Sequence, residues 1–538
     1  MGLWNGIGNG IGRKKSGINW SSYWTTLISA IIANTARGSI VLTFPSPTSL
    51  VAADASVTVN GVARAIISAS WSGSVWTLVL VTEVLPGDVV VVLFEKTGQT
   101  ANVTNNVDIW YGFTITEANT SPDVTRTAST AGDMTLHRAD SSPIQANIRG
   151  CLLLDNGTVN YYLKADDWTK KADGTASNRD GSDGQVMMEW QSFYYKVDTN
   201  SPSVGMHQFK FSPYPCAGFT LVPKHYVSAY EAALYRPTNK LSSVINISAD
   251  YRGGNNTSAW DGAANSLLGK PATSVNRTNF RTYARNRGTG WNQYGYNDHK
   301  WLFWLFVLTY ATRNSQKAVN ATLDSNGFRQ GGLGNGVSTA NSTEWNTFCG
   351  YNPFIACGAS DALGNGSGEV SVTVTDFGGA GINRSFTVPR FLGHEHPFGH
   401  VWKILDGINI NIQAADSGGE SQVWVADNPA SWNDSNYTGY TNRGLMHRAN
   451  GYMNKALAGD GAEFVPSEAG ISGSGTGTYY CDYFYTSIPA SGTSLRMLFV
   501  GGFANTGADG GFAYSYSYYA PSTANAYVGS KLRYQQPL

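Results

Sequence analysis

The density of residues that interrupt regular structure is the feature that most constrains the fold of this chain. Its 538 residues include 61 glycines and 19 prolines, and apolar segments with a constant period are few. Glycine destabilises a helix by about 1 kcal/mol relative to alanine, whereas short β-branched runs between Gly, Pro, Asn and Ser are typical of strands and turns. The sequence therefore predicts a mainly β protein with some α-helix.

Helical spacing of apolar residues occurs in a few segments, at 228–236, 273–288 and 298–319. The last is the strongest, because Trp301, Trp304 and the apolar residues after them recur at steps of three and four. A helix that is apolar on most sides is usually buried, so we expect a core helix there rather than a sugar-binding platform.

The chain divides into three parts. Residues 1–37 combine a Gly-rich start, a basic cluster and an amphipathic stretch, which predicts an appendage that orders against a larger assembly; a membrane-active peptide is the alternative. Residues 38–104 alternate β-branched runs with turn signals and predict a small β-sandwich. They resemble the immunoglobulin-like repeats of bacterial surface proteins, which act as spacers. Residues 105–538 form one long Gly-rich and aromatic-rich region without a repeat.

Charge is sparse and balanced. The formal net charge is zero and 14% of residues are charged. Nucleic-acid binding depends on basic patches that neutralise phosphates, so a nucleic-acid partner is not expected. Polarity comes instead from Asn, Ser, Thr, Gly and Tyr, which build neutral, hydrogen-bonding surfaces suited to sugars or protein epitopes.

The cysteines and the hydrophobic segments indicate the cellular compartment in which the protein folds. Five scattered cysteines without a C-x-x-C pair do not form a disulfide framework, which favours folding in a reducing cytoplasm. The N-terminal basic cluster follows the apolar stretch, unlike a secretory signal. The most hydrophobic run, "KWLFWLFVLTYATR", is too short to span a bilayer, so we expect a soluble protein.

The C-terminal stretch "GGFAYSYSYYAPSTANAYVGSKLRY" is unusually rich in tyrosine. Tyr514, Tyr516 and Tyr518 stand two apart, as do residues on one face of a strand. Core strands prefer aliphatic residues and Phe, which leave no hydroxyl to satisfy, and "RMLFVGG" nearby has that character. Tyrosine supplies contact area at low entropic cost, so the pattern favours an exposed recognition surface over a core strand.

Sequence signatures of catalysis are absent. The densest histidine cluster, "GHEHPFGH", holds His394, Glu395, His396 and His400. A metal site is one interpretation, but the spacing is not H-E-x-x-H and Pro397 prevents a continuous helix, so we favour loop residues that precede a strand.

Other enzymatic and ionic sites are also not expected. The sequence lacks a G-x-S-x-G elbow and a phosphate-binding loop, and its carboxylates are too dispersed to nominate a glycosidase pair. In "NRDGSDG", Asp180 and Asp183 are interpreted as turn residues, with calcium as the alternative. We therefore predict no catalytic residues, no metal ligands and no cofactor.

Several segments resemble a known group of proteins when taken in order. They are "RTNFRTYARNRGTGW", "WLFWLFVLTYATRNSQ", "PFGHVWKILDGI", "YYCDYFY" and "LFVGG…GGFAYSYSYYAPSTANAYVGSKLRY". The set resembles phage tail proteins with a C-type-lectin-like fold, which formylglycine-generating enzymes share, and it covers roughly 250–538 in patches. The opening "GLWNGIGNGIGRKKSGINWSSYWT" resembles an N-terminal segment of structural proteins from gut-bacterial phages, which implies attachment to the virion.

The resemblance implies a variable segment at about 501–534, because diversity-generating retroelements rewrite the last codons of many such genes. Gly501-Gly502 and "VGSKL" match the fixed frame, whereas Pro521 and Lys531 depart from it. By the same matching, Ala504 is also expected to be exposed. The expected ligand-binding side chains are Phe503, Asn505, Asp509, Tyr514, Tyr516, Tyr518, Tyr519 and Tyr527.

The fold that the resemblance implies also has a catalytic branch, the formylglycine-generating enzymes, whose chemistry needs a pair of copper-binding cysteines. No motif around Cys349, Cys357 or Cys481 matches that branch, and a shared fold does not transmit activity. We therefore do not expect an enzyme of the formylglycine-generating type.

Together these features predict a phage tail adhesin. Residues 1–37 would dock it to other tail proteins, and residues 38–104 would act as a spacer. Residues 105–538 would form a C-type-lectin-like α+β domain that binds a host cell-surface glycan or protein without chemistry. Multiple copies, most simply a trimer, would add avidity. It would be made in the bacterial cytoplasm and reside in the virion. A virion structural or decoration protein is the alternative, and a polysaccharide-degrading tail enzyme is a lesser one.

Overall fold

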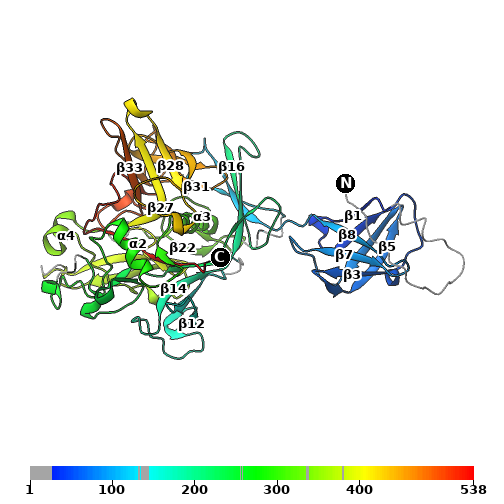
Figure 1. Cartoon of the computed structure of the whole chain (residues 1–538), viewed down its shortest axis with the longest axis horizontal. Helices are drawn as coiled ribbons and strands as arrows, with labels where there is room; N and C mark the ends of the chain where they lie inside the picture. Colours follow the sequence, from blue (N-terminus) through cyan, green and yellow to red (C-terminus); the bar gives the residue numbers. More distant parts are fainter. Residues whose placement is uncertain are drawn as a thin grey trace. The chain divides into compact units, whose positions relative to one another are not determined.

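The structure is a computed structural model of the chain, and it describes residues 27–538 except 131–133, 135–143, 255, 257, 335–338, 378–380 and 538. The chain forms two compact units, Met1–Ile109 and Trp110–Leu538 (Figure 1). The expected virion-attachment segment, 1–37, lies mostly outside the described residues. Within the described part of the chain, no helix has the length and apolar character that crossing a membrane requires.

Unit 1 is built from strands with alternating burial. Their order in the sheet is β4-β3-β7-β8-β1-β2-β6-β5, in which β1 and β8 are parallel and the other pairs antiparallel. Ile40, Leu42, Trp76 and Leu78 point inward from the central strands. The strands are β1 (Ser29–Ile32), β2 (Ser39–Thr43), β3 (Ala55–Val59), β4 (Val62–Arg64), β5 (Ile66–Ser72), β6 (Val75–Leu80), β7 (Val90–Phe94) and β8 (Gln99–Asn105).

The ends of unit 1 differ from the expected domain boundaries. Strand β1 belongs to the sheet although we assigned residues 29–32 to the appendage, because its register with β2 alternates buried and half-buried side chains. At the other end, Val107 and Ile109 are buried, and the unit closes at Ile109 rather than at residue 104.

Unit 2 is mainly β, with helices inserted between its sheets, as the turn-rich sequence predicts. One sheet has the order β10-β9-β16-β15-β17. Its strands are β9 (Tyr111–Thr116), β10 (Thr125–Ala128), β15 (Phe193–Thr199), β16 (Met206–Ser212) and β17 (Thr220–Val222).

A second sheet of unit 2 has the order β13-β12-β11-β14-β18-β36-β21, so the last strand of the chain pairs with strands from much earlier. Its strands are β11 (Arg149–Leu153), β12 (Val159–Lys164), β13 (Asp167–Lys171), β14 (Gln185–Trp190), β18 (His225–Ser228), β21 (Trp291–Gln293) and β36 (Leu532–Tyr534).

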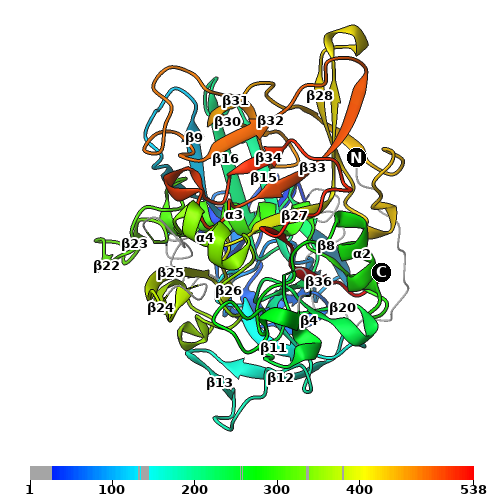
Figure 2. The same ribbon diagram turned by 90° about the vertical axis from the view of Figure 1, so that its left-hand side faces the viewer.

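The third large sheet carries most of the C-terminal third of the chain, in the order β29-β28-β27-β33-β34-β32-β30-β31, with β35 beside β27 (Figure 2). Its strands are β27 (Trp402–Gln413), β28 (Ser421–Val425), β29 (Thr441–Leu445), β30 (Gly451–Ala458), β31 (Glu463–Ala469), β32 (Tyr483–Thr486), β33 (Thr493–Val500), β34 (Ser515–Ser517) and β35 (Val528–Gly529).

Smaller elements complete unit 2. The paired short strands are β19 (Ala233–Tyr235) with β20 (Lys240–Ser242), β22 (Asn320–Leu323) with β23 (Arg329–Gln330), and β24 (Gly368–Val374), β25 (Arg384–Phe391) and β26 (His394–Glu395) in one sheet. The helices are α2 (Arg277–Arg285), α3 (Tyr296–Tyr310) and α4 (Ser342–Cys349).

The predicted core helix is confirmed. Helix α3 is buried on all sides, and its rings pack against sheets of the unit, with Trp304 4.3 Å from Phe209 and Phe306 5.6 Å from Phe391 between ring centroids. The helix ends at Tyr310 rather than at residue 319, because Ala311 adopts a left-handed conformation.

Of the other helical predictions, one is confirmed and one is wrong. Helix α2 forms within 273–288 and begins at the N-cap Asn276, whose side chain accepts a hydrogen bond from the Asn279 N–H. Segment 228–236 instead ends strand β18 and forms β19. Residues 229–234 are buried throughout, so pairing with neighbouring strands overrides their helical spacing.

Candidate functional site

Strand β34 of the tyrosine-rich C-terminal stretch lies in the third sheet, where β33, β34, β32 and β30 are neighbours (Figure 2). In β34, Ser515 and Ser517 point inward and are fully buried, whereas Tyr516 points outward and is half-buried. Tyr485 of β32 and Phe499 of β33 are the register partners of Tyr516. A period of two therefore places the serine side chains in the core and leaves the tyrosine ring on the surface.

Neighbouring strands extend this surface with tyrosines of their own. In β32, Tyr483 and Tyr485 point outward and are half-buried, while Phe484 between them is fully buried. Tyr452 of β30 is opposite Tyr483, with 5.0 Å between the ring centroids. The rings continue from Tyr483 to Tyr485 and on to Tyr516 at centroid distances of 4.7 and 5.4 Å.

We call this surface the aromatic face. Its residues are Tyr351, Tyr452, Tyr483, Tyr485, Phe503, Tyr516, Tyr518, Tyr519 and Tyr527. Tyr518 is the most open, with 44% of its surface exposed. Burial and the neighbouring Tyr519 raise the pKa of Tyr516 and of Tyr527 above the usual value, so these two phenols remain neutral.

The loop before β34 carries three further predicted residues. Phe503 is half-buried between Trp402 and Tyr527, at centroid distances of 5.8 and 5.1 Å. Asp509 accepts a hydrogen bond from the hydroxyl of Tyr452, which joins the loop to β30. Asn505 lies between them in sequence and is half-buried.

The expected exposure is wrong for two residues. Tyr514 is 4% exposed, and its ring lies 4.7 Å from that of Trp402. The ring of Tyr516 also contacts Trp402, at 5.5 Å, and the carbonyl of Tyr514 accepts a hydrogen bond from Gly501, which continues the pairing of β33 with β34. Tyr514 therefore lies on the same side of the sheet as Tyr516, but it is buried there against Trp402. Ala504 is fully buried, since its backbone pairs with His400 and Ala340.

Sequence reasoning missed four residues of the aromatic face: Tyr351, Tyr452, Tyr483 and Tyr485. For the two in β32 a signal was present. In "YYCDYFY" the outward tyrosines alternate with buried Phe484, the same pattern that marked β34. Nothing near Tyr351 or Tyr452 in the sequence indicates that they join the same surface.

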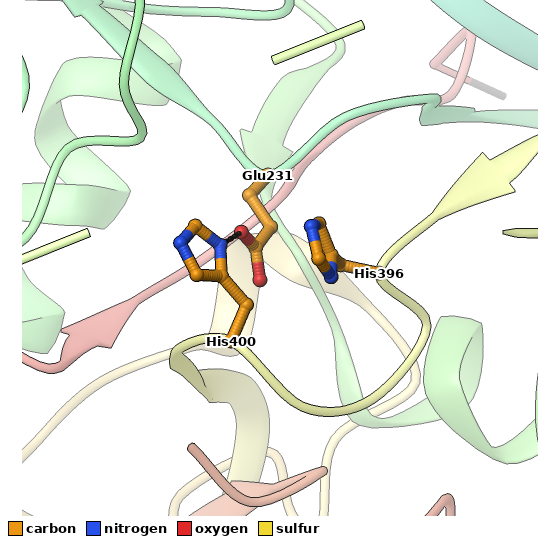
Figure 3. A group of neighbouring side chains, drawn as sticks. All are labelled: Glu231, His396 and His400. Carbon is orange, nitrogen blue, oxygen red and sulfur yellow. Dashed lines mark hydrogen bonds and ion pairs between the residues drawn. The ribbon is translucent and has the colours of Figure 1, made fainter. Parts of the chain in front are cut away.

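A separate cluster of ionisable groups lies in the interior. Glu231, His396 and His400 are buried, and their potential ligand atoms lie within 4.8 Å of one another (Figure 3). His400 Nδ1 is 2.6 Å from Glu231 Oε2, and Lys403 Nζ is 2.8 Å from Glu231 Oε1. Burial raises the pKa of Glu231, but Lys403 and His400 outweigh it and hold that pKa well below the usual range.

Two members of the cluster, Glu231 and His400, have partners that oppose a metal ion, whereas both ring nitrogens of His396 lack a hydrogen-bond partner among the described residues. His400 Nε2 faces the backbone N–H groups of Phe354 and Ile355, both 3.3 Å away, so it is the acceptor and Nδ1 carries the proton that Glu231 accepts. A metal on Nδ1 would have to displace that proton. The ammonium of Lys403 already neutralises the carboxylate, and a second cation beside it would be repelled.

The other residues of "GHEHPFGH" serve different partners. Glu395 accepts hydrogen bonds from Gly358 and Ser360, and burial together with Asp361 raises its pKa to about 7. His394 accepts a hydrogen bond from the indole of Trp190. The segment is buried: His394 and Glu395 form β26, and residues 396–400 form the loop before β27 that we expected.

The remaining candidate ion ligands, Asp180 and Asp183, accept hydrogen bonds from neighbouring residues. Asp180 accepts a hydrogen bond from Ser182, and Asp183 accepts one from the hydroxyl of Tyr161, as turn residues do. The cysteines are all buried, and within the described residues they form no disulfide with one another.

Comparisons with known proteins assign no family. No protein-family model and no curated protein matches the chain. Among solved structures, the N-terminal part of the bacterial S-layer protein SbsC is similar over 37% of this chain and 39% of that chain, with 13% identity and a TM-score of 0.14. A likeness at that score supports no statement about fold or function.

Proposed function

We propose that this protein is a non-catalytic phage tail adhesin that binds a host cell-surface glycan or protein through its aromatic face. The observation that carries the proposal is the aromatic face itself: tyrosines from β30, β32 and β34 and from the loops around them converge on one surface. Tyr and Phe rings offer large contact areas with few rotatable bonds, and phenol hydroxyls donate and accept hydrogen bonds.

Two features of the aromatic face favour recognition over simple burial. Its inward neighbours, such as Phe484 and Ser515, are fully buried and supply the sheet with its core contacts. The outward rings are only partly covered, although each contacts at least one other ring. Contiguous exposed aromatic surface on a protein marks an interaction site.

The C-type-lectin-like fold is part of the same proposal. The segments that carry the resemblance converge: "PFGHVWKILDGI" leads into β27, which pairs with β33 of "RMLFVGG" and with β35 of "VGSKL". The last strand, β36, returns to pair with β18 and β21. The same proposal includes docking through residues 1–37, a spacer role for unit 1 and a trimeric assembly. It also includes synthesis in the bacterial cytoplasm and location in the virion.

The test is a phage that carries Tyr516→Ala, Tyr518→Ala and Tyr519→Ala together. We expect normal particle numbers by electron microscopy and a loss of host adsorption of about a hundredfold or more, since a few aromatic anchors carry most of the binding energy of an interface. A phage with Tyr194→Ala, a half-buried tyrosine of β15 outside the aromatic face, is the matched control.

Three outcomes would contradict the proposal. Normal adsorption by the triple variant would remove the aromatic face from host recognition. Failure of the variant to assemble, while the purified protein stays folded, would favour a virion structural or decoration role. Release of soluble sugars from host capsule by the purified protein would favour a polysaccharide-degrading enzyme instead.

A further inference from the structure

Unit 2 contains a cavity of about 1060 Å³ that shares no lining residue with the aromatic face. It is bounded by β17, by β21, by the first turns of α3, by the loop 427–430 and by the C-terminal residues after β36. Its volume is at the upper end of the range of small-molecule sites, so the cavity is large enough for more than one sugar ring.

The lining combines aromatic rings with planar polar groups. Tyr195, Trp291 and Trp301 contribute rings, and Leu221 and Pro429 contribute apolar surface. The side-chain amides in the lining are Asn292, Asn297, Asn428, Gln535 and Gln536. Rings pack against the apolar faces of a sugar, and amides both donate to and accept from hydroxyls, so this combination fits a polyhydroxylated ligand.

Most charged groups of the lining are already paired. Arg533 Nε lies 3.0 Å from Asp298 Oδ2, and Arg443 Nη2 lies 2.8 Å from Asp427 Oδ2. Lys300 Nζ donates to the carbonyl of Gly461 at 2.7 Å. A charged ligand would have to compete with these pairs, whereas a neutral ligand leaves them intact.

Arg285 differs from the other cations of the lining. It lies on the exposed rim and donates to two neutral acceptors, Asn292 Oδ1 at 3.2 Å and the carbonyl of Pro429 at 2.7 Å. These contacts hold the guanidinium against the cavity wall, where its planar face is available to a neutral sugar as well.

Two buried acceptors of the lining lack a partner among the described residues. His225 Nδ1 lies 2.9 Å from the carbonyl of Pro223, so it carries the proton and Nε2 is an acceptor; burial lowers the pKa of this histidine and keeps it neutral. Its nearest carboxylate oxygen, Asp298 Oδ1 at 3.8 Å, is an acceptor too. Among the described residues, neither His225 Nε2 nor Asn297 Oδ1 has a hydrogen-bond partner.

Such atoms cost free energy when nothing donates to them, and buried polar atoms in native proteins nearly always have a protein, water or ligand partner. A hydroxyl group is a donor of the required size, and unlike an ammonium group it adds no charge next to Arg533 and Arg443.

We propose that this cavity is a binding site for a neutral oligosaccharide, separate from the aromatic face. The site would pack the sugar against the exposed apolar surface of Leu221 and Pro429 and hydrogen-bond its hydroxyls through the amides of the lining. This inference holds whether or not the aromatic face binds a host receptor, because the two sets of residues do not overlap.

The test uses the full-length protein and a panel of short oligosaccharides with gluco, galacto, manno and N-acetylated configurations, detected by saturation-transfer NMR and titrated by tryptophan fluorescence. We expect at least one neutral sugar to bind. Ala430→Trp, at an exposed position of the rim, and Asn297→Leu, in the wall, should each weaken that binding by about tenfold or more.

The matched control is Ala172→Trp, at an exposed position outside both the cavity and the aromatic face, which should bind the sugar with unchanged affinity. The variant with Tyr516, Tyr518 and Tyr519 changed to alanine separates the two surfaces, because a sugar held in the cavity stays bound to it. If Asn297→Leu does not fold, as judged by circular dichroism, Ala430→Trp decides alone, because residue 430 is exposed.

Three results would overturn the inference: no sugar of the panel binds at millimolar concentration, Ala430→Trp binds as tightly as the natural protein, or the tyrosine variant loses the sugar. The last result would place the sugar on the aromatic face, and it would leave the adhesin proposal standing.

Discussion

Unit 2 has two aromatic-rich regions that use different residues. Around α3 most rings are those of Trp and Phe, such as Trp304 and Phe306, and they are fully buried. Two tyrosines, Tyr296 and Tyr310, stand at the ends of the helix and are buried as well. On the aromatic face the rings are almost all those of Tyr, half-buried and in contact with one another. A buried ring without a hydroxyl leaves no polar group unsatisfied, whereas a surface ring with one keeps its hydrogen bonds to water until a ligand replaces them.

The two regions meet at Phe512. His299 of α3 lies 2.7 Å from the carbonyl of Phe512, and the ring of Phe512 contacts those of Phe303 and Phe306. Phe512 is three residues before β34. The buried helix therefore holds the base of the segment that presents the tyrosines.

The largest expected effect is on the core region. Trp304→Ala should lower the free energy of unfolding by about 3–5 kcal/mol, because the ring is fully buried and its indole N–H donates to the carbonyl of Ala462 at 2.7 Å. Urea denaturation followed by circular dichroism measures this. A loss below about 1 kcal/mol would mean that α3 is not the core of the unit.

Tyr514→Ala tests the boundary between the two regions. Tyr514 belongs to the tyrosine-rich stretch but is 4% exposed, so we expect a loss of about 3 kcal/mol in unfolding free energy, as for a core residue. The same denaturation assay applies, with Tyr518→Ala as the matched control. Equal effects of the two substitutions would break the distinction between Tyr514 and the aromatic face.

The contribution of His299, which joins α3 to Phe512, to the free energy of unfolding should depend on pH. Burial lowers the pKa of His299 to about 3, although its hydrogen bond to the carbonyl of Phe512 opposes the shift. The unfolded chain protonates this histidine near pH 6.5, so its contribution is fully present above about pH 6.5 and is lost as the pH falls toward 3.

At pH 5 this loss amounts to about 2 kcal/mol, at about 1.4 kcal/mol for each pH unit below 6.5. Denaturation curves at pH 7 and pH 5 measure it, and His299→Gln isolates it from the other buried histidines. A variant with the same pH dependence as the natural protein would show that His299 is not responsible.

The smallest expected effect is on the aromatic face. Tyr518→Ala should change the unfolding free energy by no more than about 0.5 kcal/mol, since the side chain is 44% exposed. Thermal unfolding measures the effect of the substitution on stability, and a ligand-binding assay on the same variant measures its effect on recognition. A loss of 2 kcal/mol or more would assign Tyr518 to the core.

Sequence patterns predicted the local features well. The steps of three and four in 298–319 predicted helix α3, and the alternation in "YSYSYY" predicted the outward direction of Tyr516. They failed where a short segment is buried on every side, as at 228–236, because periodicity then carries no information about the neighbouring chain.

The composition of the site was predicted only in part. Tyr516, Tyr518, Tyr519, Tyr527 and Phe503 lie together on the aromatic face, and their role in ligand binding stays a prediction. Tyr452 and Tyr485 join them through strand pairings that no local pattern specifies. The cluster of Glu231 with His400 likewise joins residues that are far apart in the chain.

By itself the sequence determined a mainly β chain, a buried helix and a tyrosine-rich C-terminal strand, because turn residues and hydrophobic periods act over a few neighbouring positions. Only the tertiary structure decided which tyrosines are exposed, which histidine faces a lysine-neutralised carboxylate, and which walls enclose a cavity. Each of those depends on the register between strands that are distant in the chain, and a shift of one residue reverses the direction of every side chain.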